Sequence, residues 1–400
     1  MFLAFLALRN LSRNLRRTII TGLAVVFGVA IQIIGWGFVD GLDENFIRAS
    51  AWTTTGDILL RPEGYPTDNQ SFPLDQALPM PAGLQAQVKG EVAGRTLFSA
   101  RLVKGAEDSR VAGIAYDAVQ DPKVFPREHW RIEGVMPAAG ALEVGVGDAL
   151  ARLLKIGVGD QVVVSVRTQE GAMNALGYTV SAIVHTDNAQ LDNVGLWVEQ
   201  QAAADLVRLD GRLTHIAIKL ASGEPEDAIG AVNAAGWTAH TVREEVADFL
   251  AVNAIRRAAI MIVVFVIMLI AALGIANTVI MAAYERVREI GTLLALGMPK
   301  RSVGRMFLFE GAILGGTAGL LGAALGVVAV MYWEAAGINL GGDALAAAKD
   351  VPMSAFIYAK FRVIPVIFAL VYSAVVAVLA SLAPARLAAN LNPADAVRAD

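Results

Sequence analysis

The sequence contains no cysteine and only four histidines, so several kinds of chemistry are excluded or unsupported. Without cysteine there are no disulfide bonds, no thiolate nucleophile and no cysteine-ligated metal. The histidines show no spacing typical of a metal site, and they lie at positions 129, 185, 215 and 240. His215 alternates with isoleucines in an expected strand, where we expect a structural role.

Other signs of catalysis are also missing. Asp187, Asp192 and Glu143 are isolated carboxylates without an evident acid–base partner. No Gly-x-Ser-x-Gly motif and no Walker-type nucleotide loop occurs. We therefore predict no catalytic residue and no metal site, and the net charge of −4 does not indicate a nucleic-acid partner.

Hydrophobic residues make up 56% of the sequence, and the mean hydropathy is +0.53. Four long runs contain no charged residue. A helix needs about 20 apolar residues to cross the roughly 30 Å hydrocarbon core of a bilayer. The four runs satisfy this length, and they are 18–39, 258–284, 311–333 and 363–384. We therefore predict a membrane protein with four transmembrane α-helices.

Basic residues in the short flanks predict the orientation of these spans. They gather before the first run, between the second and third and after the fourth, as Arg9, Arg13, Arg16, Arg17, Arg286, Arg288, Lys300, Arg301, Arg305, Arg386 and Arg398. Both termini are thus predicted to be cytoplasmic. A cleaved signal peptide is the alternative, because Ala49-Ser50-Ala51 resembles a cleavage site, but the apolar run is too long for one and ends about ten residues earlier.

The predicted division of the chain follows from these spans. It comprises a cytoplasmic amphipathic helix (1–17), the first span (18–39), an extracytoplasmic domain (40–257), the second span (258–284), a cytoplasmic loop (285–310), the third span (311–333), a short extracytoplasmic loop (334–362), the fourth span (363–384) and a cytoplasmic tail (385–400).

The spans contain no Asp, Glu, Lys, Arg or His, and Gln32 and Asn277 are their most polar residues. Ion-coupled carriers place ionisable groups within the membrane, so this absence argues against a secondary transporter or channel. Small residues recur along one face of the third span, at Gly311, Gly315, Gly319, Gly322 and Gly326. Such a face allows close helix packing, and a partner subunit is one candidate for what covers it.

The extracytoplasmic segment carries mixed α and β patterns. Segments rich in β-branched residues predict strands at 162–166, 178–184 and 213–220. Helical patterns occur at 84–92, 146–154, 200–209 and 225–235, and a further helix is expected at 241–257, continuing into the second span.

A short charged segment follows the second span. Glu285 and Arg288, and Arg286 and Glu289, are spaced for i,i+3 pairing, and Ile290, Leu293, Leu294 and Leu296 form an apolar side. Gly297 and Pro299 end the pattern. A short amphipathic helix that docks on another protein and a solvated loop fit this pattern equally well.

At this point the sequence resembles the FtsX/MacB-like permeases, the membrane subunits of type VII ABC transporters. The resemblance covers essentially the whole chain and rests on Asn277-Thr278 and on segments 285–291, 296–299, 309–311, 384–386, 392–398, 144–164 and 180–192. It implies an α+β extracytoplasmic domain, with a porter-like subdomain and an inserted β-rich lobe. It also implies a bacterial inner-membrane location and a scheme in which ATP-driven motion passes outward through the membrane, known as mechanotransmission.

The resemblance further implies partners and site residues. The segment 285–296 would be a coupling helix that docks on a separate ABC ATPase subunit, using Glu285, Arg286, Arg288, Glu289, Ile290, Leu293 and Leu294. ATP and Mg²⁺ would be bound by that ATPase and no cofactor by this chain, which would therefore not be an enzyme. A second permease subunit would complete a homo- or heterodimer.

Within the family, an outer domain of roughly 200 residues without a fused ATPase is most similar to the lipoprotein-releasing permeases LolC and LolE. This similarity implies transfer of lipoproteins to a periplasmic carrier. The alternatives are an unfused MacB-like exporter of peptides, drugs or haem with a periplasmic adaptor, and an FtsX-like regulator of a cell-wall hydrolase. Candidate substrate-lining residues, which ordinary packing or lipid contact would equally explain, are Gln32, Trp36, Phe38, Val39, Phe265, Met268 and Leu269.

Overall fold

The computed structural model describes residues 15–66, 72–186, 188–209, 211–232, 234–339 and 356–390. The chain divides into a helical unit (1–43, 251–338 and 358–400) and a second unit (44–250 and 339–357). Most of the predicted amphipathic helix at 1–17, much of the predicted loop at 334–362 and positions 391–400 of the predicted tail lie outside the described residues.

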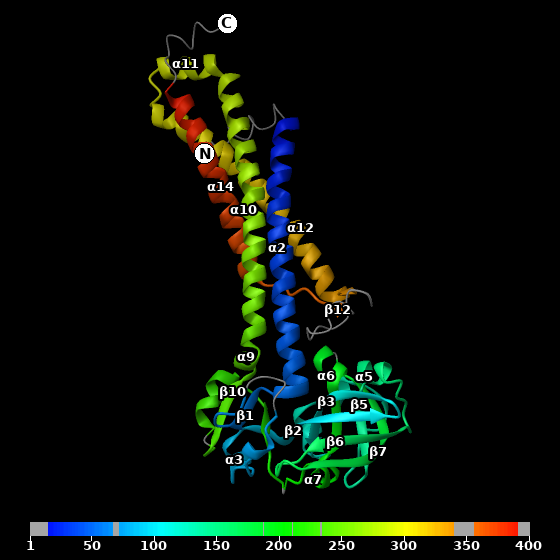
Figure 1. Ribbon diagram of the computed structural model, residues 1–400. Coiled ribbons are helices and arrows are strands. Elements are labelled where there is room, and N and C mark those ends of the chain that lie inside the picture. Colours follow the sequence, from blue (N-terminus) through cyan, green and yellow to red (C-terminus); the bar gives the residue numbers. More distant parts are fainter. Residues whose placement is uncertain are drawn as a thin grey trace. The chain divides into compact units, whose positions relative to one another are not determined.

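Four long helices, each containing one of the predicted apolar runs, form the helical unit (Figure 1). They are α2 (Leu15–Ser50), α10 (Ala247–Tyr284), α12 (Lys300–Ala336) and α14 (Val363–Ala389). All four are long and apolar enough to cross a membrane. The short helix α11 (Val287–Ala295) lies crosswise at one end of the bundle. Strands β11 (Ile338–Asn339) and β12 (Phe356–Ile357) form a small separate sheet.

Close approaches of small residues hold α2 against α10. Gly28 of α2 faces the Met268 side chain, and Gly35 faces Ile260. The hydroxyl oxygens of Thr21 and Thr278 lie 3.1 Å apart in a buried hydrogen bond between the same two helices. Such contacts replace the hydrophobic effect, which does not drive association between helices in lipid.

The second unit contains ten strands of one sheet. These are β1 (Ile58–Pro62), β2 (Gly90–Lys104), β3 (Glu107–Tyr116), β4 (Arg131–Gly134), β5 (Glu143–Gly147), β6 (Gln161–Arg167), β7 (Met173–His185), β8 (Gly195–Glu199), β9 (His215–Leu220) and β10 (Trp237–Thr241). Short helices connect them: η2 (Ala51–Thr55, a π-helix), η3 (Leu74–Gln76), α3 (Leu84–Gln87), α4 (Asp121–Val124), η4 (Arg127–His129), α5 (Asp148–Leu153), α6 (Ala189–Val194), α7 (Gln200–Val207), α8 (Pro225–Ala228), η5 (Ile229–Ala231) and α9 (Val242–Glu245).

Part of this sheet closes on itself. Strands β2, β3, β8, β5, β7 and β6 pair in turn, and β6 pairs back onto β2 between Ala100 and Val103. The closed lobe encloses an apolar core that includes Phe98, Val164 and Tyr178, and α7 packs against it. The start of β2 instead joins β9, β1 and β10 in an open sheet. The predicted α+β domain with a β-rich lobe is therefore confirmed.

Some predicted local structure is wrong. The helix expected at 84–92 ends at Gln87, because Gly90 begins β2 so close to β9 that an added Cβ would lie 2.1 Å from the Lys219 carbonyl oxygen. Sheet pairing thus overrides the local helical pattern. The helix expected at 225–235 is a single turn followed by a 3₁₀ turn. Thr241 and Glu244 form a capping box that starts α9, and α10 begins separately after Val246.

Candidate functional site

The charged segment after the second span forms the helix α11, whose buried side contains Ile290 and Gly291. The preceding Arg286 is also buried, with 8% of its surface exposed. Its charge acts on Glu310 of α12, a buried carboxylate that belongs to the segment 309–311. Arg286 is thus buried, whereas the sequence led us to expect it on a short exposed helix.

The opposite side of α11 is open. Arg288, Glu289 and Thr292 of α11 are exposed, as is Glu285, which precedes the helix. Leu296 belongs to the expected apolar side, but it ends the helix with 81% of its surface exposed. We name Glu285, Arg288, Glu289, Thr292 and Leu296 the α11 surface. It combines both signs of charge with one prominent apolar side chain, a composition suited to contact with a folded partner.

The glycines of α12 face two other helices of the same chain. An added Cβ at Gly311, Gly315 or Gly319 would come within 2.5 Å of α14, at Ser381, Ala377 and Ser373 respectively. Gly322 and Gly326 instead lie against α2, beside Val26, Val29, Ala30 and Ile33. Helices α14 and α2 of the same chain therefore cover the glycine face of α12, for which the sequence had left a partner subunit as one candidate.

The residues expected to line a substrate path do not share one face. Gln32, Val39 and Met268 are buried. Trp36 stacks on Phe368 of α14 and Phe38 packs on Trp333 of α12, with ring centroids 5.3 Å apart in each pair. Only Phe265 and Leu269 are exposed. Gln32 is unusual because neither amide atom has a hydrogen-bond partner among the described residues.

Charged and polar residues join α2 to α10 beyond the predicted spans. The Arg257 guanidinium lies 2.6 Å from Asp40 and 3.3 Å from Asp43. The Asn253 amide donates to Asp43 at 2.6 Å. Because one cation bridges two carboxylates of α2, this network fixes the two helices together at that level.

In the second unit, a buried ionic cluster is hydrogen-bonded to the π-helix η2, which follows α2. Arg95 of β2 donates to the Thr53 carbonyl oxygen at 2.6 Å and pairs with Asp121 of α4. Arg127 also pairs with Asp121. Burial lowers the pKa of Arg127 to about 10, although the Asp121 carboxylate acts in the opposite direction. Trp52 of η2 stacks on His129, with centroids 3.8 Å apart.

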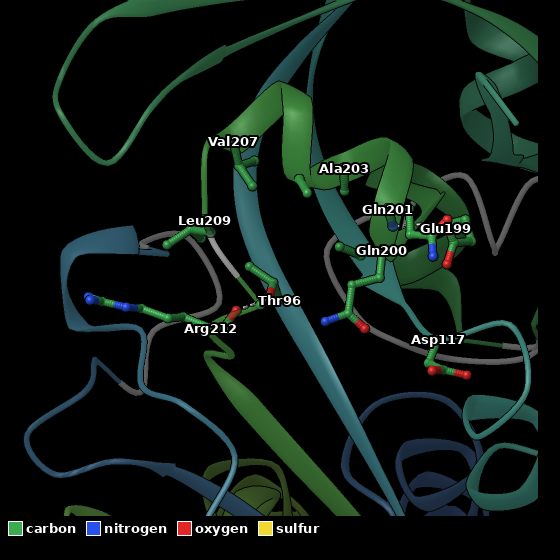
Figure 2. A pocket seen from close by; sticks show the side chains of 12 residues that line it. Thr96, Asp117, Glu199, Gln200, Gln201, Ala203, Val207, Leu209 and Arg212 are labelled. Atoms are coloured by element: carbon green, nitrogen blue, oxygen red, sulfur yellow. Dashed lines mark hydrogen bonds between the residues drawn. The ribbon is translucent and has the colours of Figure 1, made fainter. Parts of the chain in front are cut away.

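A cleft of about 330 Å³ lies beside α7 (Figure 2). Its lining includes Thr96, Asp117, Gln200 and Arg212, with Asp117 and Arg212 at opposite ends. Glu199 at its edge caps α7 by accepting from the Gln201 backbone N–H at 2.8 Å. The lining combines apolar side chains, such as Val207 and Leu209, with the carboxylates of Asp117 and Glu199.

One cluster was missed by the sequence analysis. Asp148, His185 and Asp192 come from three different elements, yet their potential ligand atoms lie within 4.8 Å of one another. Asp192 is therefore not an isolated carboxylate, and His185 does have acidic neighbours. Only the seven-residue separation of His185 and Asp192 could have signalled this, and no common ligand spacing includes it.

Comparison with known proteins identifies two family matches. The MacB-like periplasmic core domain matches residues 18–235, and the FtsX-like permease C-terminal domain matches residues 261–393. Together they cover the first span, most of the outer domain and nearly all of the last three spans.

Three relatives show how far the similarity extends. The lipoprotein-releasing system transmembrane protein LolC of Haemophilus influenzae is 22% identical over 389 residues, covering 95% of this chain and 93% of LolC. The ABC transporter permease YtrF of Bacillus subtilis is 35% identical over 133 residues, covering 32% of this chain but only 29% of YtrF. The macrolide export ATP-binding/permease protein MacB of Shewanella sp. is 22% identical over 435 residues, covering 98% of this chain and 60% of MacB.

Proposed function

Because this chain belongs to the FtsX/MacB-like family of ABC transporter permeases, we propose that it extracts lipoproteins from the bacterial inner membrane and passes them to a periplasmic carrier. The observation that supports this substrate class is the alignment with LolC, which spans nearly the full length of both chains. YtrF and MacB align over 29% and 60% of their lengths.

In this proposal the chain is the membrane subunit and a separate ABC ATPase hydrolyses ATP with Mg²⁺. The α11 surface is the part of the chain that contacts the ATPase, because it is exposed and carries both signs of charge. The chain is then a multi-pass inner-membrane protein with both termini in the cytoplasm and residues 40–257 in the periplasm. It pairs with a second permease subunit, identical or different.

The same proposal assigns the contact with acyl chains to exposed apolar residues. Phe265 and Leu269 of α10 are exposed, as are Phe27 and Ile31 of α2. These side chains offer a surface without ionisable groups, which suits saturated chains. Gln32, Trp36, Phe38, Val39 and Met268 then support this surface from within the bundle.

Reconstitution tests the substrate class. The permease and its ATPase are placed in liposomes that contain a triacylated lipoprotein, and release to a soluble carrier is followed after ATP addition. We expect ATP-dependent release that a non-hydrolysable analogue does not support. Export of a small molecule without lipoprotein release would contradict the proposal.

A second candidate function is export of peptides, drugs or haem with a periplasmic adaptor. The observation that favours it is the MacB-like periplasmic core, which covers residues 18–235. Adaptor-dependent efflux by the reconstituted complex would identify this function. An FtsX-like regulator, by contrast, would activate a cell-wall hydrolase and release nothing.

The assignment of the α11 surface is tested by reversing its acidic charges. Glu285→Lys with Glu289→Lys should weaken ATPase binding about tenfold, because two exposed ionic contacts of roughly 0.5–1 kcal/mol each are lost. Copurification of the ATPase and its affinity for the permease in detergent provide the measurement. The control is Glu170→Lys with Glu133→Lys, which reverses two exposed acidic residues of the second unit. Equal ATPase affinity in both double variants and the wild type would remove the assignment.

A further inference from the structure

Three segments of the second unit bring a histidine and two aspartates to one point. Asp148 is the first residue of α5, His185 is the last residue of β7, and Asp192 lies within α6. The His185 Nδ1 atom is 2.9 Å from Asp192 Oδ2 and 3.2 Å from Asp148 Oδ2. The three atoms lie within 4.8 Å of one another, so both carboxylates face the same imidazole nitrogen.

The backbone segments that carry Asp148 and Asp192 lie close together. An added Cβ at Gly147, just before Asp148, would lie 2.4 Å from the carbonyl oxygen of Asp192. Gly147 also pairs with Val184 in the parallel contact between β5 and β7. The three side chains therefore stand on paired strands and packed helices, which position ligands more accurately than loops do.

Neighbouring groups orient the two carboxylates. Asp192 is buried, and its Oδ1 accepts from both the backbone N–H and the hydroxyl of Thr186 at 2.8 Å. This leaves Oδ2 directed at His185. Hydrogen bonds of this kind to the far oxygen of a ligand are typical of metal sites. Asp148 is held by Arg152, whose guanidinium lies 2.7 Å from Oδ2 and 3.3 Å from Oδ1.

We propose that Asp148, His185 and Asp192 bind a divalent transition-metal cation of the zinc class. One nitrogen and two oxygen ligands suit Zn²⁺ better than Ca²⁺ or Mg²⁺, which prefer oxygen alone. With Zn–N and Zn–O bonds of about 2.0–2.2 Å in tetrahedral geometry, neighbouring ligand atoms lie roughly 3.3 Å apart. The observed separations of 2.9 and 3.2 Å need to widen only slightly.

Charge and access also fit this cation. The two carboxylates neutralise a dication, and the half-buried side chains of Asp148 and His185 leave room for water as a fourth ligand. Arg152 occupies Asp148 Oδ2, but 71% of its side chain is exposed, so it can withdraw to solvent or to Oδ1. In the described part of the chain, no second group of three such side chains comes this close. The bound cation cross-links β7, α5 and α6 and stabilises that end of the closed lobe.

Zinc titration of the full-length protein in detergent tests the site. The protein is first stripped with a chelator, and Zn²⁺ is then titrated against a chromophoric competitor. We expect a single saturable site whose affinity falls at least about tenfold in His185→Gln and in Asp192→Asn. The matched control is His240→Gln, because His240 also has two acidic neighbours but at 4.0 Å, and this change should leave the affinity unaltered. Co²⁺ in place of Zn²⁺ should give the visible absorption of a tetrahedral complex.

A gain-of-binding variant distinguishes a metal site from an ion-pair network. Arg152→Ala removes the competitor for Asp148 Oδ2, so zinc affinity should rise several-fold. A network without a metal role predicts no such gain. The exposed Arg152 side chain makes this variant safe for folding even if His185→Gln proves unstable. Equal zinc affinity in the wild type, His185→Gln and Arg152→Ala would overturn the proposal.

Discussion

His215 shows how burial can turn a single side chain into a pH-sensitive element of the fold. It opens β9, with its Nδ1 2.9 Å from the Thr214 hydroxyl and the Tyr65 ring edge-on at 5.3 Å. Burial, and then the positive charges of Arg61 and Arg95, lower the pKa of His215 to about 3. The structural role expected from the strand pattern agrees with this environment.

We predict that acid weakens the fold through His215. The folded protein keeps the imidazole neutral, whereas the unfolded chain binds a proton below its ordinary pKa of about 6.5. Stability contributed by this group is therefore complete above pH 6.5 and falls as the pH drops toward 3, by about 2 kcal/mol at pH 5. His215→Asn should flatten the decline of Tm between pH 7 and pH 5, measured by thermal unfolding in detergent.

The control for this prediction is His240→Asn, because His240 is only partly buried and its nearest acidic oxygens are 4.0 Å away. The Tm of the His240→Asn variant should change with pH as the Tm of the wild type does. Parallel profiles for His215→Asn and the wild type would contradict the predicted role of His215.

At the scale of elements, the α12–α14 contact depends on the absence of side chains. Gly311, Gly315 and Gly319 recur every four residues and so lie on one face of α12. They meet Ser381, Ala377 and Ser373 of α14, which share the same spacing. Two small faces thus approach closely enough for extensive van der Waals contact.

This packing predicts a sharp contrast between neighbouring glycines. Gly315→Leu should destabilise the bundle by about 1–3 kcal/mol, because the Cβ alone would lie 2.2 Å from Ala377 Cβ. Gly316→Leu adds the same side chain where no atom lies within 4 Å, so it should be tolerated. Tm and the yield of monodisperse protein in detergent measure the difference. Equal effects of the two substitutions would show that this face does not hold the helices together.

Helix α11 shows which features of the structure the local sequence predicts and which it does not. The charge spacing and the Gly297–Pro299 stop fitted a short helix or a solvated loop near 285–296 equally well, and the structure has a helix, α11, at Val287–Ala295. The burial of Arg286 could not be predicted from local sequence, and its charge acts on Glu310, which is 24 residues away and belongs to another helix. Local periodicity shows that a face exists, but tertiary contacts decide which residues it contains.

At the scale of the whole molecule, hydropathy alone predicted the four membrane helices, because a bilayer imposes one length and one composition. The closed lobe could not be predicted in this way. Its closure depends on the pairing of Ala100–Val103 with Val163–Val166, which is a contact between segments distant in the sequence. The triad of Asp148, His185 and Asp192 was missed for the same reason, since its members meet only after α5, β7 and α6 have packed.

We propose that motion passes outward through the membrane, as the family resemblance implies, and that α2 and α10 move as one rigid unit. They are joined by the Thr21–Thr278 hydrogen bond, by the contact of Gly28 with Met268, and by the Arg257 bridge to Asp40 and Asp43. Contacts at three levels along both helices oppose sliding or separation. A covalent link between the two helices should therefore leave transport intact.

Because the sequence contains no cysteine, a disulfide between two introduced cysteines tests this prediction without competing native thiols. Thr21→Cys with Thr278→Cys places two thiols where the hydroxyl oxygens are 3.1 Å apart, so oxidation should form a disulfide within the chain. We expect the proposed lipoprotein release by the oxidised double variant to remain within about twofold of the reduced form, because a link within a rigid body removes no required motion. Each single-cysteine variant controls for the substitution itself. Loss of release on oxidation, restored by reduction, would show that α2 and α10 move apart during the cycle.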